Sequence, residues 1–185
     1  MQAIVSLDRP ITYTGAELRS LWAYETFGIP GDNIALFAGP CSVATERLVD
    51  TADRLAGDTI EAARMLHVII EHFDDSLECA ILRQRLLIAI IKDELTTLGV
   101  QRLLRRGDDI YQDDRKLTVS IATKSPVSTL IHTGINIDPA GAPVPACGLA
   151  EFGVDHAVLA ERVAEAYLSE IESAAVARTK VRGVP

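Results

Sequence analysis

Three charged residues that could act together on a carboxylic acid lie on either side of a short polar turn. Asp108 and Asp109 come before the turn at 112–115, and Lys116 comes directly after it. The flanking residues are rich in Ile, Val, Thr and Tyr, which predicts a β-hairpin over 108–123 that brings the carboxylates close to the ammonium. Carboxylate oxygens suit Mg²⁺, and a lysine ammonium suits a carboxylate or an α-phosphate.

A second segment with polar residues follows at 127–137, where a third strand is expected. Gly134 and Asn136 lie among isoleucines near its end, so the backbone there can approach a ligand closely, and the Asn136 amide can read adenine. Activation of a carboxylic acid with ATP requires a site that neutralises anions, holds a metal through oxygen ligands and leaves small residues beside the α-phosphate. Together the two segments supply these features.

Both segments resemble motifs of the biotin- and lipoate-protein ligases. Residues 108–117 are similar to the Asn-Asp-(Ile/Leu) … Arg/Lys-Lys-(Leu/Ile)-x-Gly motif of these enzymes, and residues 133–137 are similar to their Gly-Ile-Asn-(Val/Leu)-Asn segment. The whole chain most resembles an uncharacterised prokaryotic family of domains of unknown function that is distantly related to those ligases. The resemblance has motif quality over about 107–137 and elsewhere extends to the order of the elements.

The resemblance implies a fold and a role for each of these residues. The fold is α+β, a mostly antiparallel sheet packed with helices, as in the ligase catalytic domain and the class II aminoacyl-tRNA synthetases. Lys116 matches the essential lysine, and Asp108 and Asp109 match the Asn-Asp pair, with Asp109 as a ligand of Mg²⁺. Asn136, with Gly134 beside it, matches the asparagine near the nucleotide. The implied cofactors are ATP and Mg²⁺, and the implied partners are a small carboxylic acid and a lysine of an acceptor protein.

The chain also departs from the ligase pattern. The Gly/Arg-rich loop that clamps the acid and the phosphates is missing, and the nearest regions, 37–41 and 54–58, keep single glycines. Asp108 replaces the usual Asn, and Thr118 and Val119 stand where a glycine is expected. Two hypotheses therefore stay open. One is an enzyme that forms an acyl-adenylate or transfers an acyl group, and the other is a non-catalytic domain that binds a small carboxylate, a nucleotide or a protein.

Each charged residue also has a purely structural interpretation. Lys116 could be a solvated hairpin lysine, and Asp109 could be a strand-start carboxylate paired with an arginine. Three arginines, Arg102, Arg105 and Arg106, precede the aspartates. They could bind a phosphate or pair with these aspartates, and surface ion pairs are the more frequent outcome.

The elements that must position these residues follow from hydrophobic periodicity and capping residues. A capping box formed by Thr14 and Glu17 begins the first helix, Ser42 caps the second, residues 74–76 cap the third and Asp155 caps the last. The expected helices are 14–27, 43–55, 77–98 and about 155–175, the further expected strands are 2–13, 33–38 and 65–73, and 138–146 is a Pro-rich loop.

Several polar residues of these elements are expected to have no chemical role. Glu46, Asp50, Asp53 and Asp58 form a solvated acidic face, and Gln84 lies off the buried stripe of its helix or at its margin. In the strand 65–73, the neighbours Glu71 and His72 point to opposite faces, so a metal site formed with His67 is not expected.

The composition sets limits on the class of protein. A chain of 185 residues suits one domain, over 1–178, followed by a flexible tail over 179–185. The net charge of −8 without a sustained basic run argues against nucleic acid or an anionic membrane as the main partner. The start lacks the features of a secretory signal and no apolar run approaches a membrane span, so a cytoplasmic location is expected.

The three cysteines predict neither disulfides nor a zinc site, because they are odd in number and far apart. Cys79 is expected to lie in a helix and to pack as a small apolar residue, and Cys41 and Cys147 are expected in loops. An exposed strand edge is compatible with a homo-oligomer.

Overall fold

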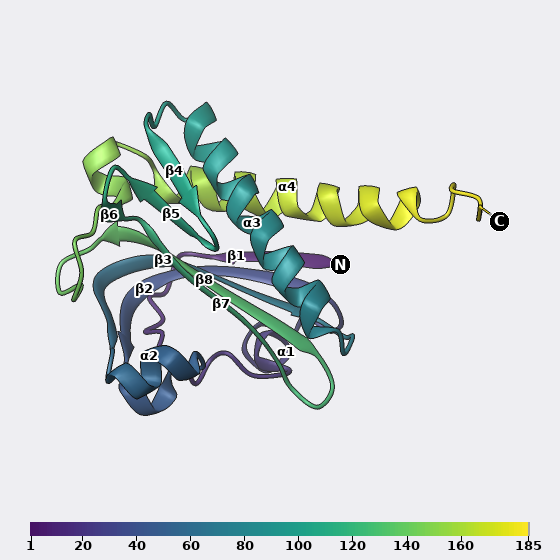
Figure 1. The fold of residues 1–185 in the computed structure, drawn as a ribbon, viewed down its shortest axis with the longest axis horizontal. Helices are drawn as coiled ribbons and strands as arrows, with labels where there is room; N and C mark the ends of the chain where they lie inside the picture. Colours follow the sequence, from purple (N-terminus) through teal and green to yellow (C-terminus); the bar gives the residue numbers. More distant parts are fainter. Residues whose placement is uncertain (185) are drawn as a thin grey trace.

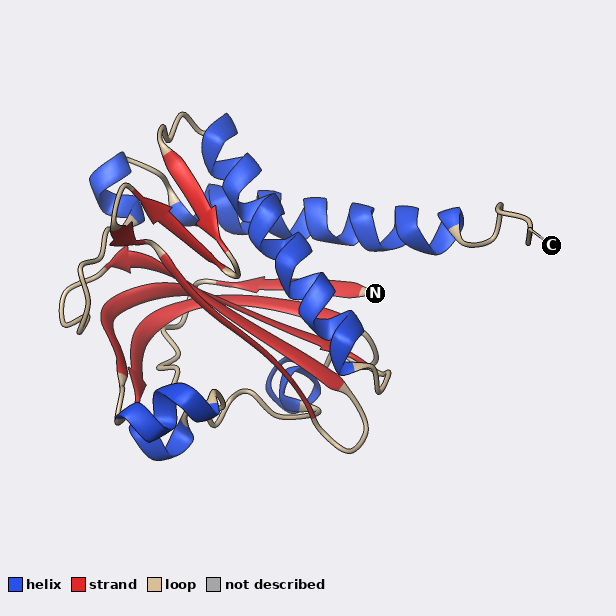
Figure 2. Cartoon of the chain, viewed as in Figure 1, coloured by secondary structure: helices blue, strands red, loops and turns tan. Residues whose placement is uncertain are grey.

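The computed structural model describes residues 1–184, which form a curved sheet with helices on both faces (Figures 1 and 2). The long helices α3 (Leu77–Thr97) and α4 (His156–Ala177) lie on one face. The short helices α1 (Trp22–Phe27) and α2 (Thr51–Ala56) lie on the other. This is the α+β architecture predicted from the sequence.

The described strands form two sheets. The main sheet contains β1 (Gln2–Ser6), β2 (Asn33–Val43), β3 (Ile60–His72), β8 (Thr129–Asp138) and β7 (Thr118–Lys124), in that spatial order. β1 is parallel to β2, and every other neighbouring pair is antiparallel. The small sheet contains β4 (Leu103–Arg106), β5 (Asp109–Gln112) and β6 (Arg115–Lys116), and short 3₁₀ helices are η1 (Thr45–Arg47) and η2 (Leu149–Phe152).

The central strand β3 explains why the main sheet has two covered faces. Leu66, Val68 and Ile70 pack into the core beneath α3 and α4, whereas Met65 and Ile69 pack on the opposite side with Trp22 of α1. Successive side chains of a strand point to opposite faces. An almost continuous apolar run therefore indicates a strand that is buried on both sides.

The two long helices begin at the predicted caps. Ser76 Oγ accepts a hydrogen bond from Cys79 N at 3.2 Å, and Asp155 Oδ1 accepts one from Ala157 N at 2.8 Å. These bonds satisfy amide groups that the first turn of a helix leaves free. The predicted helices 77–98 and 155–175 are thus confirmed to within two residues at each end.

The second predicted helix is wrong over most of its length. Strand β2 continues through Pro40 to Val43, with a register shift between Gly39 and Cys41 that accommodates the proline. The helix that follows is α2 alone, and its cap is Asp50 rather than Ser42. Leu55, expected to face the core, has an exposed fraction of 81%.

The first predicted helix begins later than expected, at Trp22. Thr14 N does donate to Glu17 Oε2 at 2.8 Å, but this capping-box contact closes a turn instead of a helix. The buried Glu71 carboxylate accepts from Leu21 N, at 3.0 and 3.1 Å, where α1 starts. A contact from a distant strand therefore sets the beginning of this helix.

The predicted hairpin over 108–123 is divided between the two sheets. β5 pairs with β4, an arginine-rich segment for which no strand was predicted. Only the short β6 pairs with the other side of β5. The next strand, β7, pairs with β8 in the main sheet. Leu117 joins the sheets, because its N donates to Ile110 O at 2.8 Å and its O accepts from Asn136 N at 2.9 Å.

The environments of Cys79 and Cys41 differ from those predicted, whereas Cys147 lies in a loop as expected. Cys79 is exposed on α3, whereas Cys41 in β2 and Cys147 after the Pro-rich loop are buried, and all three are free thiols. No helix among residues 1–184 is long and apolar enough to cross a membrane. Residues 179–184 form no helix or strand, and Pro185, the last residue of the predicted tail, lies outside the described residues.

Candidate functional site

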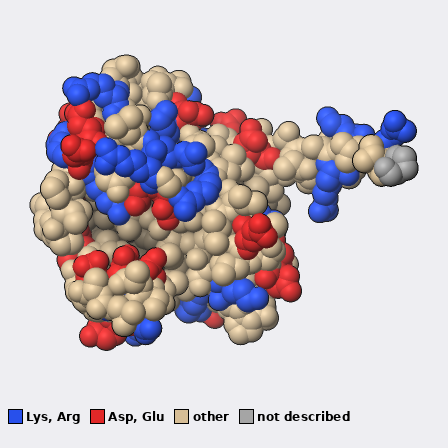
Figure 3. Space-filling view, in the orientation of Figure 1, with Lys and Arg blue, Asp and Glu red and all other residues tan. Residues whose placement is uncertain are grey.

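A cleft lies on the face of the main sheet that carries α2, beside the small sheet. It has a volume of about 380 Å³, and Ile60, Met65 and Val119 contribute to an apolar floor. A side cavity of about 250 Å³ adjoins it and shares Lys116 and Asp53 in its lining. Figure 3 shows this hollow, with Lys and Arg gathered above it and Asp and Glu along its lower edge. Clefts of this size accommodate small molecules.

Lys116 and Asp109 form an ion pair at the wall of the cleft. The Nζ–Oδ2 distance is 2.8 Å, and the exposed side-chain fractions are 30% for Lys116 and 14% for Asp109. Thr118, the residue before the position where the ligase motif has its glycine, is buried and its Oγ1 lies 3.5 Å from Asp109 Oδ1. The same Oγ1 accepts from Ile110 N at 2.8 Å. The sequence therefore correctly indicated that these charges lie close together.

The two partners shift each other's protonation in opposite ways. Burial raises the pKa of Asp109 above its ordinary value, and the Lys116 ammonium opposes that shift. Burial acts to lower the pKa of Lys116, but the charge of Asp109 and its hydrogen bond outweigh this effect and raise that pKa. Lys116 is therefore protonated at neutral pH. A lysine in this state is a fixed cation, because a base or a nucleophile would require a lowered pKa.

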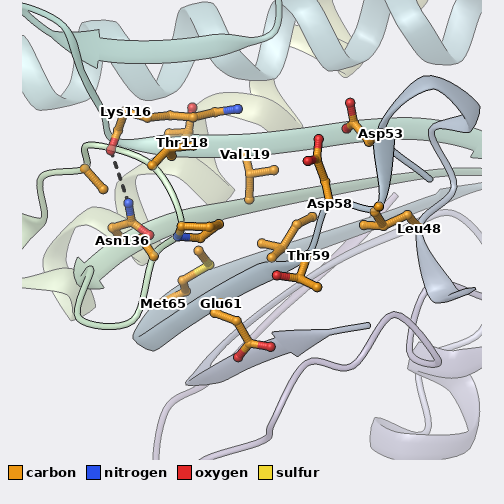
Figure 4. Close-up of a pocket in the computed structure, with 16 residues that line it drawn as sticks. Leu48, Asp53, Asp58, Thr59, Glu61, Met65, Lys116, Thr118, Val119 and Asn136 are labelled. Carbon is orange, nitrogen blue, oxygen red and sulfur yellow. Dashed lines mark hydrogen bonds between the residues drawn. The ribbon is translucent and has the colours of Figure 1, made fainter. Parts of the chain in front are cut away.

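The backbone of Lys116 is fixed by the Pro-rich loop and by Asn136. Lys116 N donates to Pro145 O at 2.9 Å, and Lys116 O accepts from Cys147 N at 3.1 Å. Asn136 Nδ2 also donates to Lys116 O, at 3.2 Å, as Figure 4 shows. Asn136 lines the cleft, and its buried Oδ1 has no hydrogen-bond partner. The amide thus positions the lysine and keeps one free acceptor.

Asp108 lines the side cavity and is held by helix α3. Its carboxylate accepts from Gln84 Nε2 at 3.0 Å and from Arg85 Nη1 at 3.2 Å. Gln84 is buried and also donates to Ser120 Oγ at 2.9 Å. The prediction that Gln84 lies off the buried stripe is therefore wrong. Gly107 has φ +66°, and a Cβ there would lie 2.8 Å from Arg85 Nη1, so this position favours glycine.

Two of the three arginines before the aspartates pair with other carboxylates. Arg102 pairs with Asp113, and Arg106 pairs with Asp114 at 3.1 Å. Arg105 Nη1 lies 3.5 Å from Gly107 O. The preference for surface ion pairs is confirmed for Arg102 and Arg106, although their partners are in the β5–β6 turn and not at 108 or 109.

Gly134 lies beneath the floor of the cleft. It pairs with Val119 across β7 and β8. A Cβ at this position would lie 2.7 Å from Met65 Sδ and 3.3 Å from Val119 Cγ1, and both of these side chains line the cleft. The glycine therefore leaves room for the Met65 and Val119 side chains that form the floor. Its assignment to nucleotide binding stays a prediction.

The acidic side of the cleft was not predicted from the sequence. Asp53 of α2 and Asp58 after it line the cleft, where a solvated face was expected. Their placement depends on α2 ending at Gly57 and on the chain turning directly into β3. The density of acidic residues before a buried strand was the available signal.

The residues offer hard oxygen ligands rather than a complete metal site. Among residues 1–184, no three His, Cys, Asp or Glu side chains lie close enough together to hold a metal ion by themselves. A Mg²⁺ ion at Asp109 would take most of its oxygen ligands from a substrate and water, as is common in sites that bind phosphates. The assignment of Mg²⁺ to Asp109 stays a prediction.

The fold is that of the catalytic domains of biotin- and lipoate-protein ligases. The biotin acetyl coenzyme A carboxylase synthetase of Helicobacter pylori, solved with bound biotinylated ATP, is similar with a TM-score of 0.55 and 14% identity, over 93% of this chain and 74% of that one. Protein Ta0514 of T. acidophilum, assigned provisionally as a lipoate protein ligase, gives a TM-score of 0.55 and 11% identity, over 92% of this chain and 85% of that one.

Within this fold, the chain belongs to the family of the domain of unknown function DUF366, which matches residues 1–182. The uncharacterized protein MJ0805 of Methanocaldococcus jannaschii is 38% identical over 179 residues, 93% of this chain and 80% of that protein. A protein of unknown function from Pyrococcus horikoshi is 41% identical, with a TM-score of 0.95 and coverage of 100% of both chains. The family resemblance inferred from the sequence is confirmed.

Proposed function

We propose that the cleft binds a small carboxylic acid and activates it as an acyl-adenylate, with Lys116 stabilising the charge that develops. The partly buried Lys116–Asp109 ion pair at the cleft wall carries this proposal. A protonated lysine that is fixed in a partly dehydrated site is a preorganised cation for a carboxylate or an α-phosphate. The ligase fold supports the proposal, because a structural neighbour binds biotinylated ATP.

The proposed cofactors are ATP and Mg²⁺. When bound, ATP would supply the adenylyl group and Mg²⁺ would neutralise its phosphates. Asp109 is the carboxylate that would hold Mg²⁺, and Asp108, fixed by Gln84 and Arg85, presents a second carboxylate to the adjoining cavity. Asn136 and Gly134 are the proposed nucleotide-side residues, since they lie on the strand beneath Lys116. Transfer of the activated acid would require an acceptor, for which a lysine of a partner protein is the proposed candidate.

A second candidate function is ligand binding without catalysis. The cleft is lined by one basic side chain, Lys116, and by the carboxylates of Asp53, Asp58 and Glu61 among the described residues. A triphosphate would face more negative than positive charge there, and no Gly/Arg-rich loop compensates for it. This observation favours a small ligand that is held without adenylation.

An exchange assay between ATP and pyrophosphate separates the two functions, because exchange requires acyl-adenylate formation. Biotin, lipoate and octanoate are the first acids to test with Mg²⁺. We expect Lys116→Ala to lower the exchange rate at least about a hundredfold, the usual cost of losing one preorganised charge-stabilising group. The far-UV circular dichroism spectrum should remain unchanged.

Lys124→Ala is the matched control, because Lys124 is an exposed lysine at the distant end of β7. Its exchange rate should equal that of the unaltered protein. Equal exchange in both variants would refute the role of Lys116. Tight binding of an acid by the unaltered protein without exchange would instead support the non-catalytic function.

A further inference from the structure

The end of the cleft at α2 and the start of β3 carries carboxylates without ion-pair partners, and Asp53 and Asp58 among them are exposed. Asp53 and Asp58 lie there, and Glu61 lines the cleft at the start of β3. No ion pair joins any of these three residues to a basic side chain within residues 1–184. Figure 4 shows Asp53 and Asp58 at one end of the cleft and Asn136 at the other, with the Lys116 side chain extending from the Asn136 end towards the carboxylates.

The carboxylates of Asp53 and Asp58 repel each other. Burial and the charges of Asp50 and Asp58 raise the pKa of Asp53 above its ordinary value, while the Lys116 ammonium acts against the shift. Asp50 is already engaged as the cap of α2, because its Oδ1 accepts from Ala52 N at 2.7 Å. A cationic group placed near Asp53 and Asp58 would relieve the repulsion.

A second unpaired acceptor lies at the Lys116 end of the same cleft. Asn136 has an exposed fraction of 4%, its Nδ2 is used by Lys116 O, and its Oδ1 has no hydrogen-bond partner. Buried polar atoms without a partner are uncommon and costly. A ligand that donates an N–H group beside its carboxylate would satisfy this oxygen.

The space between the two ends is lined by apolar side chains. Met65 and Val119 lie in the floor between Asn136 and the acidic end (Figure 4). An aliphatic segment there would remove apolar surface from water on both sides. The cleft thus offers a cation, a free acceptor, an apolar floor and an anionic end.

We infer that the cleft binds an amino acid that carries an ammonium group at the far end of an aliphatic side chain. Its carboxylate lies at Lys116, its α-ammonium group donates to Asn136 Oδ1, and its distal ammonium group lies at Asp53 and Asp58. This places the Asn136 acceptor on the acid instead of the nucleotide and leaves Gly134 on the nucleotide side. The inference rests on the proposed function for the carboxylate end and names the substrate class of that site. Each charged group of the ligand then meets a group of opposite charge or a free acceptor.

Isothermal titration calorimetry without ATP tests this inference through two matched pairs of probes. L-lysine differs from norleucine, and 6-aminohexanoate differs from hexanoate, by the distal ammonium group. We expect the member of each pair that has this group to bind at least about tenfold more tightly, because a close charge pair contributes that much or more. L-lysine should also bind more tightly than 6-aminohexanoate, through Asn136.

The variants Asp53→Asn and Asp58→Asn locate the distal group. Each should reduce the preference for L-lysine over norleucine and leave the affinity for norleucine unchanged. Asp93→Asn is the control, because Asp93 is an exposed carboxylate on α3. Thermal unfolding confirms that each variant is folded, and the comparison of probes on the unaltered protein does not depend on any variant.

Several results would overturn the inference. These are equal affinities within each pair, no binding of any of the four acids, or binding of Mg²⁺ alone that both variants abolish. L-lysine binding with the expected preference but without ATP–pyrophosphate exchange would uphold the ligand class and refute activation. Equal exchange rates with hexanoate and 6-aminohexanoate would uphold activation and refute the ligand class.

Discussion

At the scale of single residues, two kinds of contact determine what Lys116 can do. Asp109 Oδ2, at 2.8 Å from Nζ, holds the charged end of the side chain. Pro145 O and Asn136 Nδ2 hold the backbone at the other end. The lysine is therefore both charged and immobile, which costs little reorganisation when an anion arrives. A nucleophilic lysine would instead require a lowered pKa.

The ion pair gives a direct prediction for Asp109→Asn. The Lys116 ammonium would lose its carboxylate partner while keeping its burial, so its pKa should fall. We expect the free energy of unfolding to decrease by about 1–3 kcal/mol, less than for a fully buried pair because Lys116 is partly exposed. Urea denaturation at neutral pH measures the change.

Asp114→Asn provides the comparison, since Asp114 pairs with Arg106 and its side chain is 92% exposed. That variant should change the unfolding free energy by less than about 0.5 kcal/mol. A similar small effect for Asp109→Asn would mean that the buried pair contributes no more than a surface pair.

The sequence predicts these residues unevenly. Asp109 and Lys116 were brought together correctly, because they lie on opposite sides of one short turn and need only local pairing. The role of Asn136 could not be predicted in the same way. Its bond to Lys116 O depends on Leu117 crossing between two sheets, a tertiary feature without a local signal.

At the scale of elements, a buried carboxylate sets the start of α1. Glu71 in β3 accepts from Leu21 N and, at 2.6 Å, from Ser128 Oγ. Leu21 has a left-handed conformation, with φ 64°, at the N-cap position. A non-glycine residue keeps this conformation only where its surroundings enforce it. The carboxylate of Glu71 is one such restraint.

Glu71→Gln is therefore predicted to loosen α1. A glutamine side chain would bring an N–H₂ group towards donors that need an acceptor, and we expect a loss of about 1–3 kcal/mol in unfolding free energy. Trp22, the one tryptophan of the chain, follows Leu21 directly and is buried, so its fluorescence emission should shift to the red. Glu25→Gln, at an exposed position of the same helix, should leave the emission unchanged.

The same scale explains which elements the sequence predicts well. Helices α3 and α4 have local caps and long periodic stripes, so local rules suffice. The extension of β2 beyond Pro40 depends instead on pairing with β3, whose partner residues lie about twenty positions later. Long-range pairing of this kind overrides local propensity.

At the scale of the whole molecule, the curved sheet separates two different interiors. The face under α3 and α4 is an apolar core, whereas the other face also buries a stack of Tyr13, His67 and His132. His67 Nε2 donates to Gly39 O at 3.3 Å, so its Nδ1 accepts from His132 Nε2 at 3.2 Å. This assignment of protons follows from the hydrogen-bond network and requires a neutral His67 ring. Burial keeps the His132 ring neutral as well.

The buried histidines predict that the folded state loses stability in mild acid. Burial lowers the pKa of His67 from 6.5 to about 4, and burial together with His67 lowers that of His132. Below pH 6.5 these histidines bind protons in the unfolded chain but not in the folded chain. Their contribution to the free energy of unfolding is therefore fully present above that pH and falls towards pH 4. His67 alone corresponds to a loss of about 3 kcal/mol over this window.

Urea denaturation at a series of pH values between about 7.5 and 4.5 measures this loss, and His67→Gln identifies its source. Glutamine can still donate to Gly39 O but does not titrate, so the variant should have a flatter dependence of unfolding free energy on pH. His72 and His156, whose pKa values are also lowered by burial, leave a residual slope of the same sign. Asp32 and Asp74 have lowered pKa values, so their stabilisation is lost only at more acidic pH. An unchanged slope in His67→Gln would show that His67 is not the titrating group, since His132 still titrates in this variant.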